Sequence, residues 1–145
     1  MARRAALDIL ARREHTTQEL LAKLLVKGYA QEVAAEAVAR LAREGLASDA
    51  RFVEMLVSSR RARGYGPMRI RHELEQKGVA SELIDQWLDA SGTDWIKQVR
   101  QVREKKYGTQ LPSDYVERAR QARFLQSRGY TRDQIMRVLS TDDRD

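Results

Sequence analysis

The hydrophobic residues of this chain recur three or four positions apart, which is the spacing of one buried face of an α-helix. A short pattern occurs three times within this spacing: a leucine, then a basic residue, a glycine and an apolar residue. The copies read LLVKGY, LEQKGV and LQSRGY, and their glycines, Gly28, Gly78 and Gly129, are 50 and 51 residues apart. This regular distance predicts three related structural repeats.

Each copy of the pattern predicts the end of a helix. The helix dipole favours a cation in the last turn, and glycine adopts the left-handed conformation that follows many helices. An apolar stripe with helical spacing precedes each copy and another follows it. The stripes are Leu7, Ile9, Leu10, Val33 and Val38, then Phe52, Met55, Leu56, Leu83, Ile84, Trp87 and Leu88, then Trp95, Ile96, Val99, Val102, Ile135, Val138 and Leu139. The sequence therefore predicts nine helices.

The nine helices group into three modules of three helices, which we expect to span residues 1–47, 48–92 and 93–145. Start signals support this division: two capping boxes and two N-cap residues, at Thr16 with Glu19, Thr131 with Gln134, Ser48, and Thr93. A module of roughly 50 residues can barely support its own core. We therefore expect an all-α protein whose modules stack into an elongated, curved array.

The composition excludes several kinds of chemistry. The chain has no cysteine, and no apolar run reaches the roughly 18 residues of a membrane span, so we expect a cytoplasmic protein. His15 and His72 lie in different modules, where we expect solvent-facing positions, and no phosphate-binding or nucleophile motif is present. The acidic tail TDDRD has the character of a solvated terminus. We predict a non-enzyme without a metal or cofactor.

The net charge of +6 is distributed unevenly, because the three modules carry +2, 0 and +4. The stretch RRARGYGPMRIR predicts a basic helix end, a glycine-rich corner and a helix that begins at Pro67. Arg69 and Arg71 can pair with Glu73 and Glu75 one turn later. Arg60, Arg61 and Arg63 have no carboxylate three or four positions away and form a surplus. In the third module, Arg100, Arg118 and Arg120 can pair with nearby acids, and a similar surplus consists of Lys97, Arg103, Lys105, Lys106 and Arg123.

The two surplus groups would form a basic surface for phosphates or for an acidic protein groove if they lie on one side of the array. The aromatic residues divide into two kinds. Trp87 and Trp95 fall on apolar stripes and are expected in the core. Tyr65 and Tyr107 each precede a glycine after a basic helix end, where a ring could be exposed for contact or could pack. We include Tyr65, Arg69 and Arg71 with the surplus cations as candidate partner-binding residues.

Three separated stretches resemble the RecX family of bacterial regulators of the RecA recombinase: ALDILARREHTTQEL, DARFVEMLVSSRRARGYGPMRIRHELEQKGV and RARQARFLQSRGY. The matching residues are Asp49, Arg51 and Phe52, then Gly64, Gly66, Pro67, Arg69 and Arg71, then Arg128, Gly129 and Tyr130. The resemblance implies tandem three-helix modules in a curved array. It also implies a partner, the RecA filament on DNA, in whose helical groove such proteins lodge and inhibit its ATPase, strand-exchange and co-protease activities.

Two other functions stay open from the residues themselves. The chain could be a free-standing DNA-binding module, whose affinity for naked DNA would fall steeply with salt. It could also be a helical scaffold for an unrelated acidic protein. Recovery of the recombinase from bacterial lysate separates the scaffold from the regulator. We expect the chain to act as a monomer in each case.

Overall fold

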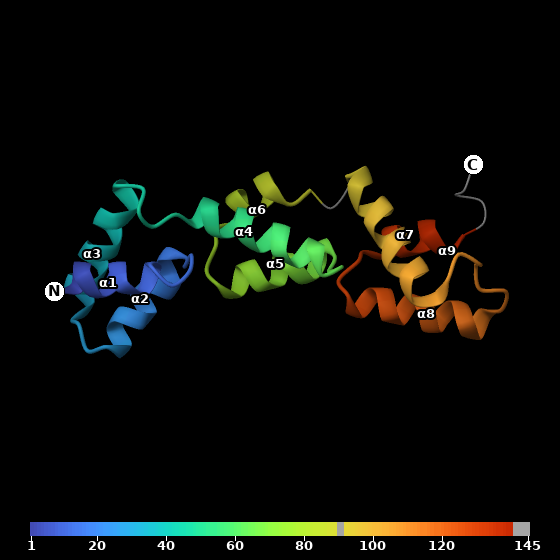
Figure 1. Cartoon of the computed structure of the whole chain (residues 1–145), viewed down its shortest axis with the longest axis horizontal. Coiled ribbons are helices and arrows are strands. Elements are labelled where there is room, and N and C mark those ends of the chain that lie inside the picture. The colour runs from blue at the N-terminus through green and yellow to red at the C-terminus, as the bar shows by residue number, and fades with distance from the viewer. Residues whose placement is uncertain (90–91, 141–145) are drawn as a thin grey trace. The chain divides into compact units, whose positions relative to one another are not determined.

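The computed structural model describes residues 1–89 and 92–140, and this part of the chain consists of nine α-helices joined by turns and loops (Figure 1). They are α1 (Ala2–Leu10), α2 (Thr17–Val26), α3 (Gln31–Arg43), α4 (Asp49–Ala62), α5 (Pro67–Gln76), α6 (Ser81–Trp87), α7 (Thr93–Tyr107), α8 (Tyr115–Ser127) and α9 (Arg132–Leu139). The predicted all-α fold class is confirmed. The acidic tail lies outside the described residues. None of the described helices has the length and apolar character needed to cross a membrane.

The chain divides into two compact units. The first unit comprises residues 1–56 and 73–87, and the second comprises 57–72 and 88–145. Helices α4 and α5 each contribute residues to both units, so the predicted middle module does not form a compact unit of its own. The module boundaries near residues 47 and 92 stay predictions.

The first unit has a core formed by one face of each of α1, α2 and α3. Ala6, Leu20, Leu24 and Leu41 are fully buried there, with Ile9, Ala34, Val38 and Ala47 packed around them. Val33, which the apolar pattern also placed on the buried face, is 52% exposed. It lies on α3 five positions before Val38, a spacing that turns its side chain away from the core.

The three repeated glycines end their helices in the predicted way. Gly28, Gly78 and Gly129 have φ angles of +100°, +82° and +100°. In each case the next residue's N–H donates to a carbonyl five residues back, from Tyr29 to Leu24 at 3.2 Å and at the matching positions of the other two copies. These paired bonds form a Schellman motif, which satisfies carbonyls that the end of a helix leaves open.

Most of the predicted helix starts are confirmed. Thr16 with Glu19 and Thr131 with Gln134 form complete capping boxes before α2 and α9. The Oγ of Ser48 accepts from the N–H of Arg51 at 3.1 Å before α4. The prediction for Thr93 was wrong, because α7 begins at Thr93 and its N-cap is Gly92, which is extended there. Asp114 caps α8 and was not predicted.

His15 is a correction to the sequence analysis, because it is 2% exposed instead of solvent-facing. Its Nδ1 lies 3.0 Å from the carbonyl oxygen of Arg13, and its Nε2 lies 2.8 Å from Nζ of Lys23. Burial lowers the pKa of His15, and the charges of Arg13 and Lys23 lower it further, against the opposing effect of the carbonyl. The two contacts fit an imidazole that donates from Nδ1 to the carbonyl of Arg13 and accepts at Nε2 from the ammonium of Lys23. His72 is exposed, as predicted.

The two tryptophans differ. Trp95 is 3% exposed and belongs to the core of the second unit, as predicted, whereas Trp87 is 42% exposed. Helix α6 ends at Trp87, so the helical stripe that supported a core position stops at this residue.

A contact between the start of α2 and the end of α5 joins distant segments within the first unit. The Oγ1 of Thr16 donates to the carbonyl of Lys77 at 2.8 Å, and Nζ of Lys77 donates to the carboxylate of Glu19 at 2.9 Å. A Cβ at Gly78 would overlap the side chain of Gln18. The repeated glycine therefore ends one helix and also allows another helix to approach.

Candidate partner-binding surface

The glycine-rich corner between α4 and α5 packs backbone to backbone against the turn between α8 and α9 in the second unit. The N–H of Gly66 donates to the carbonyl of Arg128 at 2.7 Å, and the N–H of Met68 donates to that of Gly129 at 2.9 Å. A Cβ at Gly66 would lie 2.5 Å from the carbonyl carbon of Gly129. Glycine is thus required here for close approach of two chain segments, and the corner is not a phosphate-binding loop.

A hydrogen-bond network centred on Gln98 of α7 fixes this corner. Its Nε2 donates to the carbonyl of Tyr65 at 2.9 Å and to the hydroxyl of Tyr130 at 2.8 Å. The hydroxyl of Tyr130 donates in turn to the carbonyl of Gly64 at 2.7 Å, and its burial raises the pKa of this phenol. Sequence reasoning missed Gln98, because one glutamine on a helix carries no pattern.

Aromatic rings hold several of the basic side chains of this unit. The guanidinium of Arg61 lies 4.3 Å from the ring centre of Trp95, and Nε of Arg61 donates to Oε1 of Gln98 at 2.9 Å. The ammonium of Lys106 lies 4.0 Å from the ring centre of Phe124, and the guanidinium of Arg128 lies 5.2 Å from it. A ring attracts a cation without cancelling its charge. These cations are therefore positioned and still carry their full charge.

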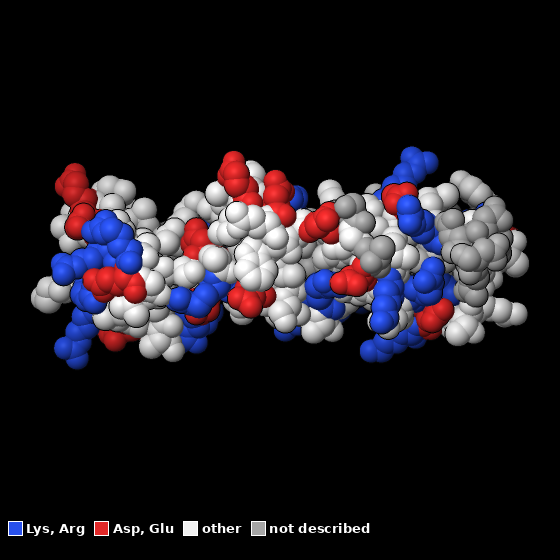
Figure 2. All heavy atoms as spheres, turned by 90° about the horizontal axis from the view of Figure 1, so that it is seen from above, with Lys and Arg blue, Asp and Glu red and all other residues white. Residues whose placement is uncertain are grey.

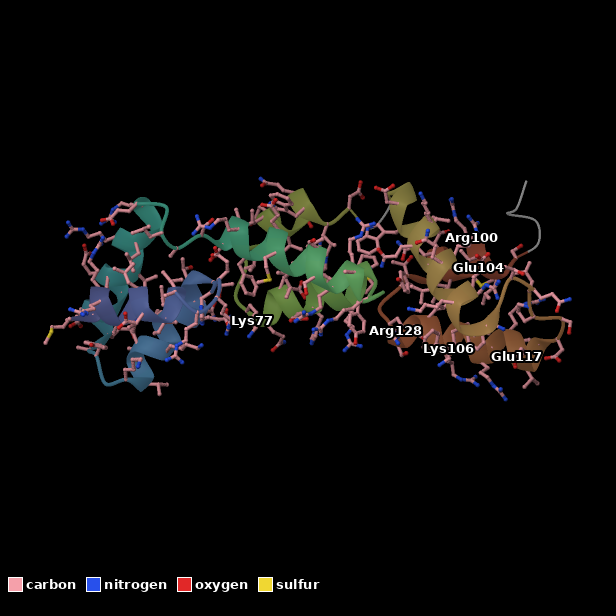
Figure 3. The ribbon with its side chains drawn as sticks, viewed as in Figure 1. Lys77, Arg100, Glu104, Lys106, Glu117 and Arg128 are labelled. Carbon is pink, nitrogen blue, oxygen red and sulfur yellow. The ribbon has the colours of Figure 1, made fainter. Side chains whose placement is uncertain are left out.

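Five cations line one cavity of about 470 Å³ in the second unit: Arg61, Arg63, Lys105, Lys106 and Arg128. The other lining residues include Gln98, Gln101, Val102 and Phe124, and no aspartate or glutamate is among them. Within residues 1–89 and 92–140, no carboxylate forms an ion pair with any of the five. Figure 3 shows Lys106 and Arg128 beside α8, with Glu117 toward the opposite end of that helix. The cavity is a region of concentrated positive charge.

Outside the cavity, several cations pair with carboxylates, in the first unit and also in the second, where Arg120 pairs with Glu117 and Arg137 with Asp133. Arg3 lies 2.7 Å from Glu44, and Arg51 lies 3.0 Å from Glu14. Figure 2 shows acidic side chains set directly among the basic ones over α1–α3. Such exposed pairs contribute little to stability but reduce the local positive field. The unpaired positive charge of the site therefore lies in the second unit.

The structure brings together part of the predicted set. Arg61, Arg63, Lys105 and Lys106 line the cavity. Lys97 and Arg123 are exposed outside its lining, Arg71 is half-buried, and Arg60 is half-buried with a 3.4 Å bond to the Oγ of Ser59. Arg128 was missed as a lining residue, although its place before the repeated glycine was recognised.

Tyr65 lies between two guanidinium groups, with that of Arg69 at 3.9 Å and that of Arg128 at 5.3 Å from its ring centre. The amide of Gln98 donates to the carbonyl of Tyr65, and the hydroxyl of Tyr130 donates to the carbonyl of the preceding residue, Gly64. Tyr107 packs edge-on against Phe124, at 5.8 Å and 87° between the rings. Both tyrosines are half-buried, so each has a packing role.

Arg103 is the clear correction among the candidate residues, because it is 0% exposed and cannot meet a partner. Its guanidinium donates to the carbonyls of Gly108 at 3.1 Å, Thr109 at 3.4 Å and Gln110 at 3.3 Å, and to Oε1 of Gln121 at 3.2 Å. The chain leaves α7 at Gly108 in a conformation with φ of +85°, which turns these carbonyls toward the arginine. Arg103 therefore organises the loop between α7 and α8.

The chain is an all-helical protein built from repeated three-helix modules, with a basic cavity in its second unit. No group of acidic or histidine side chains among the described residues could hold a metal ion. The chain matches the RecX first three-helix domain over residues 2–41, the second over 48–88 and the third over 93–139. It belongs to the RecX family of regulatory proteins, which are non-catalytic.

Known relatives support this assignment over nearly the whole chain. The chain is 52% identical to the regulatory protein RecX of Ectopseudomonas mendocina, with 94% of this chain and 91% of the relative covered. It is 46% identical to that of Halorhodospira halophila, with 99% and 89% covered. The crystal structure of RecX from Lactobacillus salivarius matches with a TM-score of 0.82 over 95% of this chain and 92% of that one. The two sequences are 20% identical, and the structural match shows a shared fold.

Proposed function

We propose that this protein binds the filament that the RecA recombinase forms on DNA, lodges in the helical groove of the filament and inhibits its ATPase, strand-exchange and co-protease activities. Membership of the RecX family supports the choice of partner. The observation that carries the proposal is the cavity of five cations without a carboxylate, because it offers charge that the fold itself does not neutralise. Such filaments form on chromosomal DNA, so the proposed function places the protein in the cytoplasm.

The contacts that we propose are electrostatic. Arg63, Lys105 and Lys106 have exposed side chains at the cavity and would meet acidic side chains of recombinase subunits or phosphates of the DNA within the filament. Lys97 and Arg123 would extend this surface. Arg61 is held by the ring of Trp95 and the side-chain oxygen of Gln98, and Arg128 is held by the ring of Phe124 and the carbonyl of Arg63. Charge-assisted contacts contribute about 1.5 to 3 kcal/mol each when water is excluded.

Inhibition needs no chemistry from this chain. A bound protein changes the filament's cycle only if it binds one conformational state more tightly than another. A monomer that bridges neighbouring recombinase subunits in one state would resist the movement between subunits that accompanies nucleotide turnover. The three activities would then fall together, because all of them require the same cycle.

The test is the ATPase activity of recombinase filaments titrated with the protein at moderate salt. We expect inhibition by the parent chain and at least tenfold weaker inhibition by the triple variant Arg63→Glu, Lys105→Glu and Lys106→Glu. The matched control is Arg4→Glu, Arg12→Glu and Lys27→Glu, three exposed cations of the first unit. Equal inhibition by the two triple variants would contradict the proposal.

The affinity of the parent for naked DNA tests the alternative of a free-standing DNA-binding module. If the parent binds naked DNA as tightly as the filament, and high salt abolishes both equally, DNA is the main partner. We expect weak binding to naked DNA beside strong binding to the filament. Circular dichroism and thermal unfolding confirm that each variant is folded before it is compared.

A further inference from the structure

The basic cavity of the second unit has the features of a small-molecule site. This role would be separate from contact with a filament. Its lining comes from three places: the end of α4 and the turn after it, the part of α7 from Gln98 to Lys106, and the end of α8 with Arg128 directly after it. Its volume of about 470 Å³ lies within the range of roughly 300–1,000 Å³ that is usual for ligand pockets. A ligand would therefore meet cations from several directions at once.

Three of the five cations around the cavity are held in place by contacts within the fold. Arg61 is held by the ring of Trp95 and by Gln98, and Lys106 is held over the ring of Phe124. Arg128 is held over the same ring and donates to the carbonyl of Arg63 at 3.4 Å. Positioned side chains lose less freedom when a ligand binds, and close like charges without counter-charges favour a multiply charged anion.

The neutral groups of the cavity indicate which part of a ligand would be recognised. Lys106 covers the ring of Phe124 and Tyr107 packs edge-on against it. The amide of Gln98 is already bonded to Arg61, Tyr65 and Tyr130. The cavity therefore offers neither a free ring face for stacking a nucleobase nor a free Gln98 amide for reading one. The available chemistry is that of guanidinium and ammonium groups, which bind phosphate oxygens.

From this arrangement we propose that the cavity is a binding site for a polyphosphate group, such as pyrophosphate or the triphosphate of a free nucleotide. The phosphates would accept from Arg61, Arg63 and Arg128 on one side and from Lys105 and Lys106 on the other. The attached nucleoside, where there is one, would extend out of the cavity without specific contacts. The site does not depend on the proposed function, because it is measured on this protein alone.

Phosphate chemistry also occurs in the backbone of a nucleic acid, where each phosphodiester carries one charge. A compact chain of two or three phosphates places several charges within the reach of all five cations. The cavity should therefore prefer pyrophosphate to a phosphodiester segment with the same number of phosphates. This difference separates the two sources of the ligand.

The experiment is isothermal titration calorimetry of the full chain, without recombinase, with pyrophosphate, ATP, adenosine and a short single-stranded oligonucleotide. We expect one equivalent of pyrophosphate or ATP to bind with similar affinity, and no binding of adenosine. Lys105→Gln with Lys106→Gln should weaken pyrophosphate binding at least tenfold. The matched control, Arg4→Gln with Lys27→Gln in the first unit, should bind like the parent.

Absence of pyrophosphate binding to the folded parent would overturn the proposal, as would equal binding by the two double variants. Binding of the oligonucleotide alone would assign the cavity to a phosphodiester backbone and would also overturn it. Failure of the recombinase assay together with intact pyrophosphate binding would contradict the proposed function and leave this site standing.

Discussion

Three basic residues of the second unit show how the surroundings decide the role of a side chain. Arg103 is buried and donates to backbone carbonyls, Arg61 is half-buried against Trp95, and Lys105 is exposed at the cavity. In the sequence all three are cations without a carboxylate at helical spacing. Arg103 is fully buried, so it contributes to stability and is unavailable for binding, whereas Arg61 gives one donor to Gln98 and still lines the cavity together with Lys105.

Replacement of Arg103 by methionine should lower the free energy of unfolding by about 2 to 4 kcal/mol, because the buried side chain of Gln121 and three partly buried loop carbonyls lose their donor. Urea denaturation measures this change. Lysine at the same position should be intermediate, since an ammonium cannot reach all of the acceptors of a planar guanidinium. A loss below about 0.5 kcal/mol for the methionine variant would show that water replaces the arginine at no cost.

Two glycines with the same backbone angle provide a matched pair. Gly28 and Gly129 both have φ of +100°, but a Cβ at Gly28 would meet nothing within 4 Å, whereas one at Gly129 would lie 2.7 Å from the backbone nitrogen of Arg69. Gly28→Ala should cost about 1 to 2 kcal/mol from backbone strain. Gly129→Ala should cost more, because the start of α5 must move. Equal melting temperatures for the two variants would contradict the close approach.

At the scale of elements, the starts of α2 and α5 make similar contacts with the ends of later helices. Thr16, before α2, donates to the carbonyl of Lys77 through its side chain, and Gly66, before α5, donates to the carbonyl of Arg128 through its backbone. Lys77 and Arg128 hold the same place in the repeated pattern, directly before the glycine. In these two copies, the pattern ends one helix, and the carbonyl of its basic residue accepts a hydrogen bond from the start of another helix.

The contact in the first unit should make stability depend on pH. Burial alone would raise the pKa of Glu19, but hydrogen bonds from Lys77, Arg13 and the backbone of Thr16 lower it to about 2, against 4.5 without these partners. The unfolded chain then binds the proton more tightly than the folded chain. Stability from this group is present above pH 4.5 and is lost as the pH falls toward 2.

Urea unfolding between pH 6 and pH 2 measures this dependence, and Glu19→Gln is the control, because an amide preserves the capping geometry but does not titrate. We expect the parent to lose more stability than the variant over this window. Parallel curves for the two proteins would show that Lys77 and Arg13 do not stabilise the ionised carboxylate.

Across the whole molecule, the cations at the cavity of the second unit differ from the paired surface cations. Surface cations pair with carboxylates in both units, for example with Glu44 in the first and with Glu117 in the second. In the second unit, rings hold part of the charge and leave it open to an anion. The net charge of +6 does not contain this distinction. Because the cavity cations all lie in the second unit, both proposed binding functions belong to that unit.

The helices and most of their ends could be predicted from the order of residues alone. Helical periodicity, the glycine after a basic residue, and the capping boxes are local features, whose physics acts within one or two turns of the chain. They were sufficient for the all-α class, the nine described helices and the three Schellman motifs. The motifs spread over the chain were also sufficient for the family.

Which side chains are buried, exposed or hydrogen-bonded depends on the tertiary structure. The burial of His15 and Arg103, the exposure of Trp87, and the network around Gln98 depend on residues far away in the chain. The cavity brings Arg61 and Arg63 together with Lys105 and Lys106, about forty positions later in the chain. From the sequence, we could say only that these groups would form a basic surface if they lay on the same side. Burial and electrostatic fields depend on distances in space, and local patterns contain no such distances between remote segments.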